Sequence, residues 1–160
     1  MEIPLQLYAA IENELTSQST NRLAALAAEL SKSYRTGKPF NQGKYLRSQE
    51  DVTAYAAFRL PATFAAVHSV ISQVKERSSD WNPKTVLDVG AGPGTAMWAA
   101  LTLCSDIEHI TLLEREKYMI DLGKRLSAYS TLTTVHNAEW MKVDITGTWE
   151  VCPHDLVIAS

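Results

Sequence analysis

The chain has 160 residues, of which 46% are hydrophobic and 21% are charged, and its formal net charge at pH 7 is −3. This composition is that of a soluble globular protein with enough chain for one domain and its core. No apolar run approaches the roughly 20 residues that a membrane-spanning helix needs, so we expect no membrane anchor. The negative charge gives no general attraction to nucleic acid, and any RNA contact must come from a local basic patch.

The first residues are unlike a targeting peptide. Acidic residues stand at Glu2, Glu12 and Glu14, and no basic residue precedes Arg22. Secretory and organellar targeting peptides instead carry basic residues near their start and few acidic ones. The sequence therefore predicts a cytoplasmic protein.

Residues 1–80 are predicted to form a helical region. Apolar side chains recur at helical spacing over residues 4–15, and a second helix is expected to begin near Thr20. A longer apolar stretch over residues 52–74 contains Pro61, which should kink this helix or split it in two. We therefore expect three or four helices before the chain changes character.

A basic and aromatic stretch lies between the second and third of these helices. Residues 34–47 include two glycines and a proline and should form a loop. The stretch 32–47 carries no acidic residue, and its basic residues are Lys32, Arg35, Lys38, Lys44 and Arg47. Cations attract phosphates and aromatic rings stack on bases, so this composition suits RNA. The alternative is a solvated loop whose aromatic side chains cap a neighbouring pocket.

Residues 81–160 alternate strand and helix in the manner of a parallel α/β sheet. The expected strands are 85–89, 109–114, a weak third strand near 133–136, and 155–160. Helices are expected between the first three strands, over 95–103 and 115–129. The predicted fold class is therefore α/β, with four strands and an N-terminal helical region.

A glycine-rich turn follows the first strand. It contains Gly90, Gly92 and Gly94, preceded by Asp88 at the end of the strand. Glycine permits a positive φ and lets the backbone touch a ligand, and the next helix N-terminus attracts an anionic group such as a carboxylate. The dinucleotide fingerprint would need a glycine at position 95, where this sequence has threonine. The alternative is a plain tight turn with Asp88 as a strand-end cap.

An acidic residue, Glu114, closes the second strand 24 residues after Gly90. An acid at this place can accept hydrogen bonds from both hydroxyls of a ribose. It can also be a residue that merely starts the next helix. The order of strand, acid, spaced glycines, helix, strand and acid favours a ligand site.

This pattern resembles motif I and the following acidic residue of class I S-adenosylmethionine-dependent methyltransferases. The resemblance implies a Rossmann-like sheet that binds S-adenosylmethionine, with the glycines at the methionyl end, Asp88 orienting that end and Glu114 on the ribose. A residue after the third strand would abut the adenine, and Glu139, Trp140 and Asp144 compete for that role. The residues expected to bind the cofactor are Asp88, Gly90, Ala91, Gly92, Pro93, Gly94, Glu114, Arg115, Glu139, Trp140 and Asp144.

Further segments resemble the methyltransferase-like family of small-ribosomal-subunit assembly factors, which has mitochondrial members. They are YRTGKPF at 34–40, AYAAFRLPATFAAV at 54–67 and LDVGAGPGTAMWAA at 87–100. The resemblance implies association with ribosomal RNA or the small ribosomal subunit, and an iron–sulfur cysteine cluster later in the family's chain. Cys152-Pro153-His154 resembles part of that cluster only superficially, and no metal site follows from this sequence.

The resemblance implies a methyltransferase acting on small-subunit ribosomal RNA. Two alternatives fit the same residues: an assembly factor that binds the cofactor without turnover, and a small-molecule methyltransferase. No catalytic residue is predicted, because acceptor-side residues of this superfamily follow the fourth strand. A class I sheet has seven strands, so we expect a C-terminal part of the same protein to cover the edge of the fourth strand.

Overall fold

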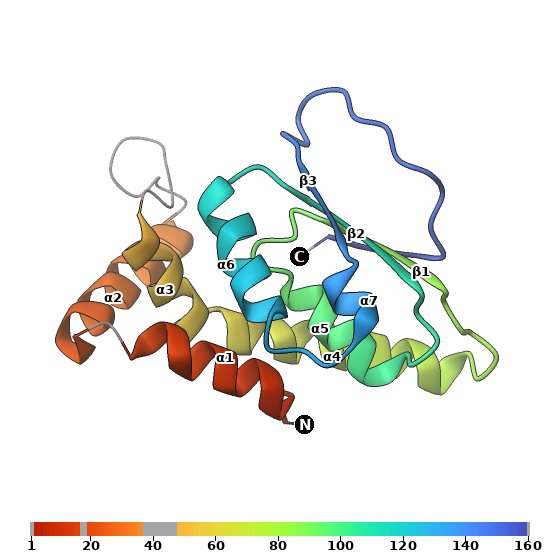
Figure 1. Cartoon of the computed structure of the whole chain (residues 1–160), viewed down its shortest axis with the longest axis horizontal. Coiled ribbons are helices and arrows are strands. Elements are labelled where there is room, and N and C mark those ends of the chain that lie inside the picture. Colours follow the sequence, from red (N-terminus) through yellow and green to blue (C-terminus); the bar gives the residue numbers. More distant parts are fainter. Residues whose placement is uncertain (1, 17–18, 37–47, 160) are drawn as a thin grey trace.

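The computed structural model describes residues 2–16, 19–36 and 48–159. Four helices come first and a parallel sheet with its connecting helices follows (Figure 1). The first four helices are α1 (Leu5–Leu15), α2 (Thr20–Thr36), α3 (Gln49–Phe58) and α4 (Leu60–Arg77). Among the described residues, no helix is both long enough and apolar enough to cross a membrane.

The break between α3 and α4 follows from local sequence. Ser48 and Asp51 form a capping box at the start of α3, in which each side chain accepts from the other residue's backbone N–H. The helix ends at Arg59, and Pro61 stands in the first turn of α4, where its missing N–H costs no hydrogen bond. The predicted split at Pro61 is confirmed.

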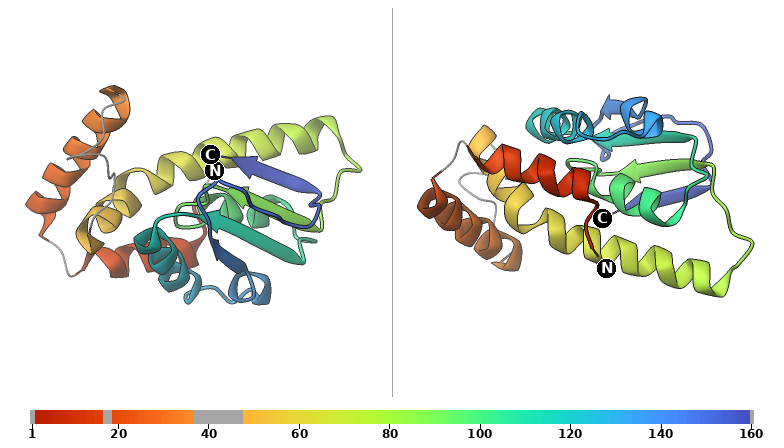
Figure 2. Two further views of the ribbon diagram at one scale, coloured as in Figure 1. Left: turned by 90° about the horizontal axis from the view of Figure 1, so that it is seen from above. Right: turned by 60° about the horizontal axis from the view of Figure 1, so that its bottom comes forward.

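The sheet has four parallel strands in the order β3-β2-β1-β4. The strands are β1 (Thr85–Val89), β2 (His109–Glu114), β3 (Glu139–Lys142) and β4 (Leu156–Ala159), and the connecting helices are α5 (Thr95–Leu103), α6 (Lys117–Ser127) and α7 (Thr133–His136). The helices lie against one face of the sheet, and the left view of Figure 2 looks onto the other face. The predicted α/β fold is confirmed.

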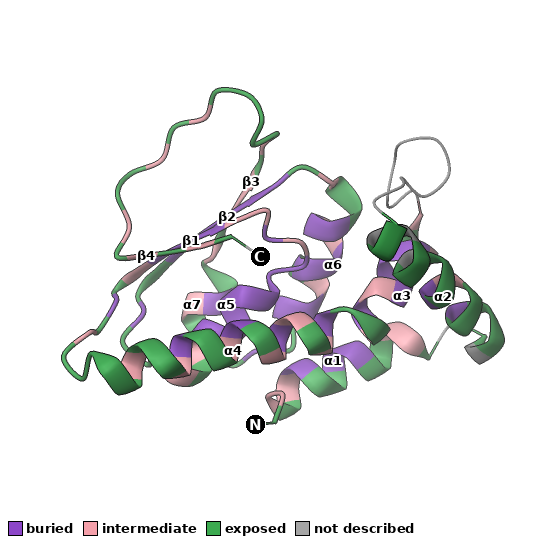
Figure 3. Ribbon diagram, turned by 180° about the vertical axis from the view of Figure 1, so that it is seen from behind, coloured by how far each residue is buried: buried purple, intermediate pink, exposed green. Residues whose placement is uncertain are grey.

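One hydrophobic core joins the helical region to the sheet. It includes Leu7 of α1, Phe64 of α4, Trp98 of α5 and Leu112 of β2, all of them buried. In Figure 3 the buried residues follow the central strands and the inner sides of the helices, whereas the outer side of α4 is exposed. Because this core is continuous, the first four helices help to hold the strand ends in place.

Two sequence predictions about the elements are wrong. Residues 133–136 form the short helix α7, and the third strand lies later, over Glu139–Lys142. The β-branched residues Thr133, Thr134 and Val135 suggested a strand, whereas the true edge strand has exposed polar ends and shows no apolar run. The second helix also continues to Thr36, so residues 34–36 are helical and not loop.

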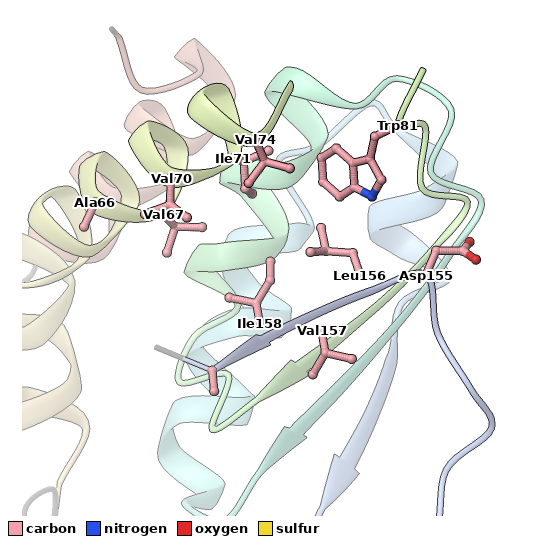
Figure 4. A pocket seen from close by; sticks show the side chains of 11 residues that line it. Ala66, Val67, Val70, Ile71, Val74, Trp81, Asp155, Leu156, Val157 and Ile158 are labelled. Carbon is pink, nitrogen blue, oxygen red and sulfur yellow. The ribbon is translucent and has the colours of Figure 1, made fainter. Parts of the chain in front are cut away.

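An apolar groove follows the outer edge of the sheet. Among the described strands, β4 pairs with β1 alone, and α4 runs alongside it (Figure 4). The groove between them is about 480 Å³ in volume, and Leu156 and Ile158 of β4 point towards Val67 and Ile71 of α4. Of the two edge strands, β3 and β4, it is β4 that borders this groove.

Candidate functional site

The glycine turn after β1 has the backbone geometry that glycine alone adopts without strain. Gly90, Gly92 and Gly94 have φ values of 73°, 55° and 77°. The N–H groups of Gly90 and Ala91 both donate to the carbonyl oxygen of Leu113 at 2.9 Å, which holds the turn against the end of β2. A Cβ on Gly90 would meet no atom of the described residues within 4 Å, so this part of the turn borders open space.

The carboxylate of Glu114 fastens the same turn from the end of β2. Its Oε2 accepts the N–H of Gly92 at 2.8 Å, and its Oε1 accepts the N–H of Glu116 at 2.7 Å. Glu114 is buried, and each of its oxygens keeps a second lone pair for a further donor. The side chain therefore shapes the turn and can still accept hydrogen bonds from a ligand.

Asp88 is fully buried at the end of β1, and neither of its carboxylate oxygens has a hydrogen-bond partner among the described residues. Burial, followed by the nearby charge of Glu114, raises the pKa of Asp88 from 3.8 to about 7. An unpaired buried carboxylate costs stability. Such a group is typical of a site in which a bound ligand supplies the missing partner.

Buried polar atoms without partners gather around the glycine turn. Within the described residues they belong to Asp88, Thr95 and Trp98, which lie on β1 and α5, and to Ser127 on α6. Four of these five atoms therefore lie on the strand and helix that the turn joins. Their clustering there favours a polar ligand at the turn over an accident of packing.

A cavity of about 250 Å³ opens beside the turn, at the carboxyl ends of β1, β2 and β3. Its lining includes Gly90, Glu114, Arg115, Asp144 and Ile145. Ligands of open α/β sheets bind at this end of the strands, in the crevice where the strand order reverses. The cavity and the sequence motif thus coincide.

The charged residues of this cavity restrain one another. Arg115 lies 4.0 Å from Asp144, and Asp144 Oδ1 accepts both the hydroxyl and the N–H of Thr146, at 2.7 and 3.0 Å. The hydrogen bonds from Thr146, and then the charge of Arg115, lower the pKa of Asp144. Asp144 therefore favours its ionised form and is a hydrogen-bond acceptor in the lining of this cavity.

The three residues that competed for the adenine role separate in space. Asp144 follows β3 and lines the cavity, whereas Glu139 and Trp140 lie on β3 itself and line no part of it. The Trp140 ring packs on the sheet's helix-covered side, where Cβ atoms on Gly94 and Gly123 would lie 3.2 and 2.3 Å from its Cη2. Trp140 thus packs where two glycines leave room.

Tyr55 of α3 reaches the glycine turn, which the sequence reading missed. A Cβ on Gly92 would lie 3.8 Å from the Tyr55 hydroxyl oxygen. The two residues are 37 positions apart in the chain, and the only local signal was that Tyr55 stands in a segment resembling the assembly-factor family. The helical region therefore contributes a side chain to the site.

The candidate RNA residues fall partly outside the described residues. Lys32 and Arg35 are exposed in the last two turns of α2. Lys38, Lys44 and Arg47 lie in 37–47, which the structure does not describe. The exposed basic end of α2 is the described part of this stretch.

Sheet order, glycine turn and cavity together define the class I methyltransferase fold. The crystal structure of the plantazolicin methyltransferase BpumL, in complex with a substrate analogue and SAH, is similar with a TM-score of 0.50 and 12% identity, over 86% of this chain and 48% of that one. A candidate RNA methyltransferase from Pyrococcus horikoshii has a TM-score of 0.41 at 21% identity, over 89% and 59% of the two chains.

The particular family follows from sequence similarity. Residues 49–160, more than half of the chain, match the family described as mitochondrial small ribosomal subunit Rsm22, and the chain belongs to that family. The human mitochondrial ribosome assembly protein METTL17 is 30% identical over 73 residues. This match covers 45% of the present chain and 16% of the human protein.

The prediction of a cytoplasmic protein is wrong, because the matched family and the human relative are both named as mitochondrial. The prediction rested in part on Glu14, which α1 uses in packing. Leu7, Ala10 and Ile11 of this helix are buried, and Glu14 accepts two hydrogen bonds from Arg125 of α6, at 2.7 and 2.9 Å. The acidity of a packed helix says nothing about the compartment.

Proposed function

We propose that the chain binds S-adenosylmethionine at the glycine turn and works as a methyltransferase-like assembly factor of the small ribosomal subunit. The observation that carries the cofactor assignment is the buried carboxylate of Asp88, which has no partner among the described residues. The ammonium group at the methionyl end of the cofactor, directly or through a water, would supply the missing partner. Family membership supports the assembly role.

Each residue of the cavity has a defined part in this proposal. Glu114 accepts from the ribose hydroxyls while it holds Gly92, and Asp144 accepts from the adenine amino group. Arg115 and Ile145 contact the base from the same cavity. Tyr55 covers the turn from α3 and limits the access of water to it.

Methyl transfer to ribosomal RNA of the small subunit is the second candidate function. When bound, S-adenosylmethionine supplies a methyl group on a positively charged sulfur, which makes it an activated donor. The chain then has only to orient the two reactants and exclude water, so it needs no nucleophilic relay. The intact glycine turn with both acids, Asp88 and Glu114, favours this candidate.

Calorimetric titration tests the cofactor assignment. We expect the chain to bind S-adenosylhomocysteine more tightly than NAD, because Asp88 and the threonine at position 95 suit a methionyl end and not a pyrophosphate. Tighter binding of NAD would overturn it. Transfer of a labelled methyl group to small-subunit RNA, lost in Asp88→Asn, would then separate the second candidate from an assembly factor without turnover.

RNA contact through the basic end of α2 is a further part of the proposal. Lys32 and Arg35 are exposed there, one turn apart. Phosphate contacts weaken with salt, and the log–log slope for a single strand is about 0.7 per phosphate neutralised. Replacing both residues with glutamine should weaken RNA binding and flatten this slope, with cofactor affinity unchanged. A loss of cofactor affinity instead would make this segment part of a lid.

A further inference from the structure

A second cavity is lined in part by Trp140 and by no residue of the glycine turn. It is about 390 Å³ in volume and lies between the end of α6, the short helix α7 and β3. It shares no lining residue with the cavity beside Glu114. Its polar and aromatic lining residues are Lys124, Ser127, His136 and Trp140.

Ser127 indicates that this cavity is more than a gap in packing. Its hydroxyl is buried and has no hydrogen-bond partner among the described residues. A serine inside a helix ordinarily bonds to the carbonyl oxygen one turn earlier or points to solvent, and Ser127 does neither. It is also the one buried polar group without a partner, among the described residues, that lies outside β1 and α5.

The other lining groups are complementary to a nucleotide. Lys124 is exposed and takes part in no ion pair found within the described residues. His136 Nε2 lies 2.7 Å from the carbonyl oxygen of Ser130, and because a carbonyl only accepts, Nε2 carries a proton. In the neutral imidazole, Nδ1 is then the acceptor. No lining residue is acidic.

Trp140 provides a fixed aromatic surface. One edge of its indole ring is wedged against Gly123, whose absent side chain makes the space, and the residue as a whole is half-buried. A ring held in this way loses little freedom when a base stacks on it. The cavity volume is near the lower end of small-molecule sites, about 300–1,000 Å³, which suits one nucleotide and excludes a helix.

We propose that this cavity binds one nucleotide of a single-stranded RNA segment. The base stacks on Trp140, Ser127 and His136 Nδ1 make its polar contacts, and Lys124 lies at its phosphate. The cavity site rests on the RNA partner proposed above and specifies where one of its nucleotides binds. Neither cofactor binding nor methyl transfer is required for it. It assigns to Trp140 a role outside the cofactor cavity.

The test measures binding of a fluorescently labelled, short single-stranded RNA to the chain and to three variants. Ser127→Ala should weaken binding about threefold to tenfold while the melting temperature stays equal or rises, because an unpaired buried hydroxyl is removed. Lys124→Gln should weaken binding and lower the salt slope by about 0.7. Lys117→Gln is the control, since it changes the charge of the same helix outside the cavity.

Crosslinking locates the bound nucleotide. RNA that carries 5-iodouridine should crosslink to Trp140 on irradiation, and nucleoside monophosphates should compete. If Ser127→Ala binds RNA as tightly as wild type and the crosslinks lie elsewhere, the nucleotide site is not in this cavity. The chain would still be an RNA-binding protein. Absence of RNA binding in every form would overturn both the cavity site and the RNA partner. If the chain binds nucleoside monophosphates but not RNA, the proposal of an RNA ligand is wrong and the cavity is a site for a free nucleotide.

Discussion

Asp88 illustrates, at the scale of one residue, how a ligand site can cost stability. Its pKa in the folded chain is about 7 and its ordinary value is 3.8, so between these values the folded state binds more protons than the unfolded state. Stability therefore falls as the pH rises through this range, and above it the full penalty of the buried charge is present. The penalty is on the order of 4 kcal/mol at most.

We predict that Asp88→Asn stabilises the chain without ligand at pH 8 and has little effect near pH 4. The amide has nearly the same shape and removes the charge that burial penalises. Denaturant unfolding at both pH values measures this difference. The same variant should bind S-adenosylhomocysteine more weakly than wild type. Wild-type affinity should rise as Asp88 ionises around pH 7, and that of the variant should not. Equal stability of variant and wild type at pH 8 would show that Asp88 has a partner in solution.

Glu114 holds the glycine turn and, in the proposed function, also binds the ribose, so its substitution should affect both the stability of the fold and cofactor affinity. Glu114→Ala leaves the N–H groups of Gly92 and Glu116 without acceptors, which typically costs about 1–3 kcal/mol for each buried group. Cofactor affinity should fall roughly tenfold or more in calorimetry. Glu114→Gln keeps one acceptor oxygen, so its stability and its cofactor affinity should lie between those of wild type and Glu114→Ala. If folded Glu114→Ala binds the cofactor as tightly as wild type, Glu114 only holds the glycine turn and does not bind the ribose.

At the scale of the elements, the packing of α6 on β3 depends on a missing side chain. A Cβ on Gly123 would lie 2.3 Å from Trp140 Cη2 and 3.0 Å from the carbonyl oxygen of Pro93. The helix therefore needs glycine at this position to approach both the strand and the glycine turn. Elsewhere α1 is tied to α6 by the paired side chains of Glu14 and Arg125.

We predict that Gly123→Ala destabilises the chain by about 1–3 kcal/mol, the usual cost of overpacking. Intrinsic helix propensity alone would make alanine stabilising here, so the sign of the change in the free energy of unfolding distinguishes packing from propensity. Gly147→Ala is the control, because its Cβ would be 3.4 Å from the nearest atom, in an exposed loop. A stabilised Gly123→Ala chain would mean that Trp140 is free to move.

At the scale of the whole molecule, the exposed edge of β4 is the main hazard. A strand with one partner presents unpaired N–H and C=O groups, and here an apolar groove lies beside it. Val70 of α4 and Val157 of β4 are both exposed and both line this groove. The 160-residue chain therefore has a surface suited to pairing with a second copy of itself.

We predict that the 160-residue chain self-associates, and that Val70→Lys reduces this association without loss of stability. The lysine adds a charge to the groove at a position that is already exposed. Size-exclusion chromatography with light scattering over a range of concentrations measures it. Leu132→Lys is the control, an exposed apolar residue outside the groove. A wild-type chain that is monomeric at every concentration would contradict the prediction.

Sequence alone was enough to predict β1, the glycine turn, α5 and β2, because an apolar strand, closely spaced glycines and an apolar helix are local signals. It could not place β3, since this edge strand is only half-buried and shows no apolar run. Three features came from the tertiary structure: Asp88 has no partner among the described residues, Tyr55 reaches Gly92, and Trp140 packs on Gly123. Those contacts join segments distant in the chain, and their energy depends on burial and distance, which no local pattern encodes.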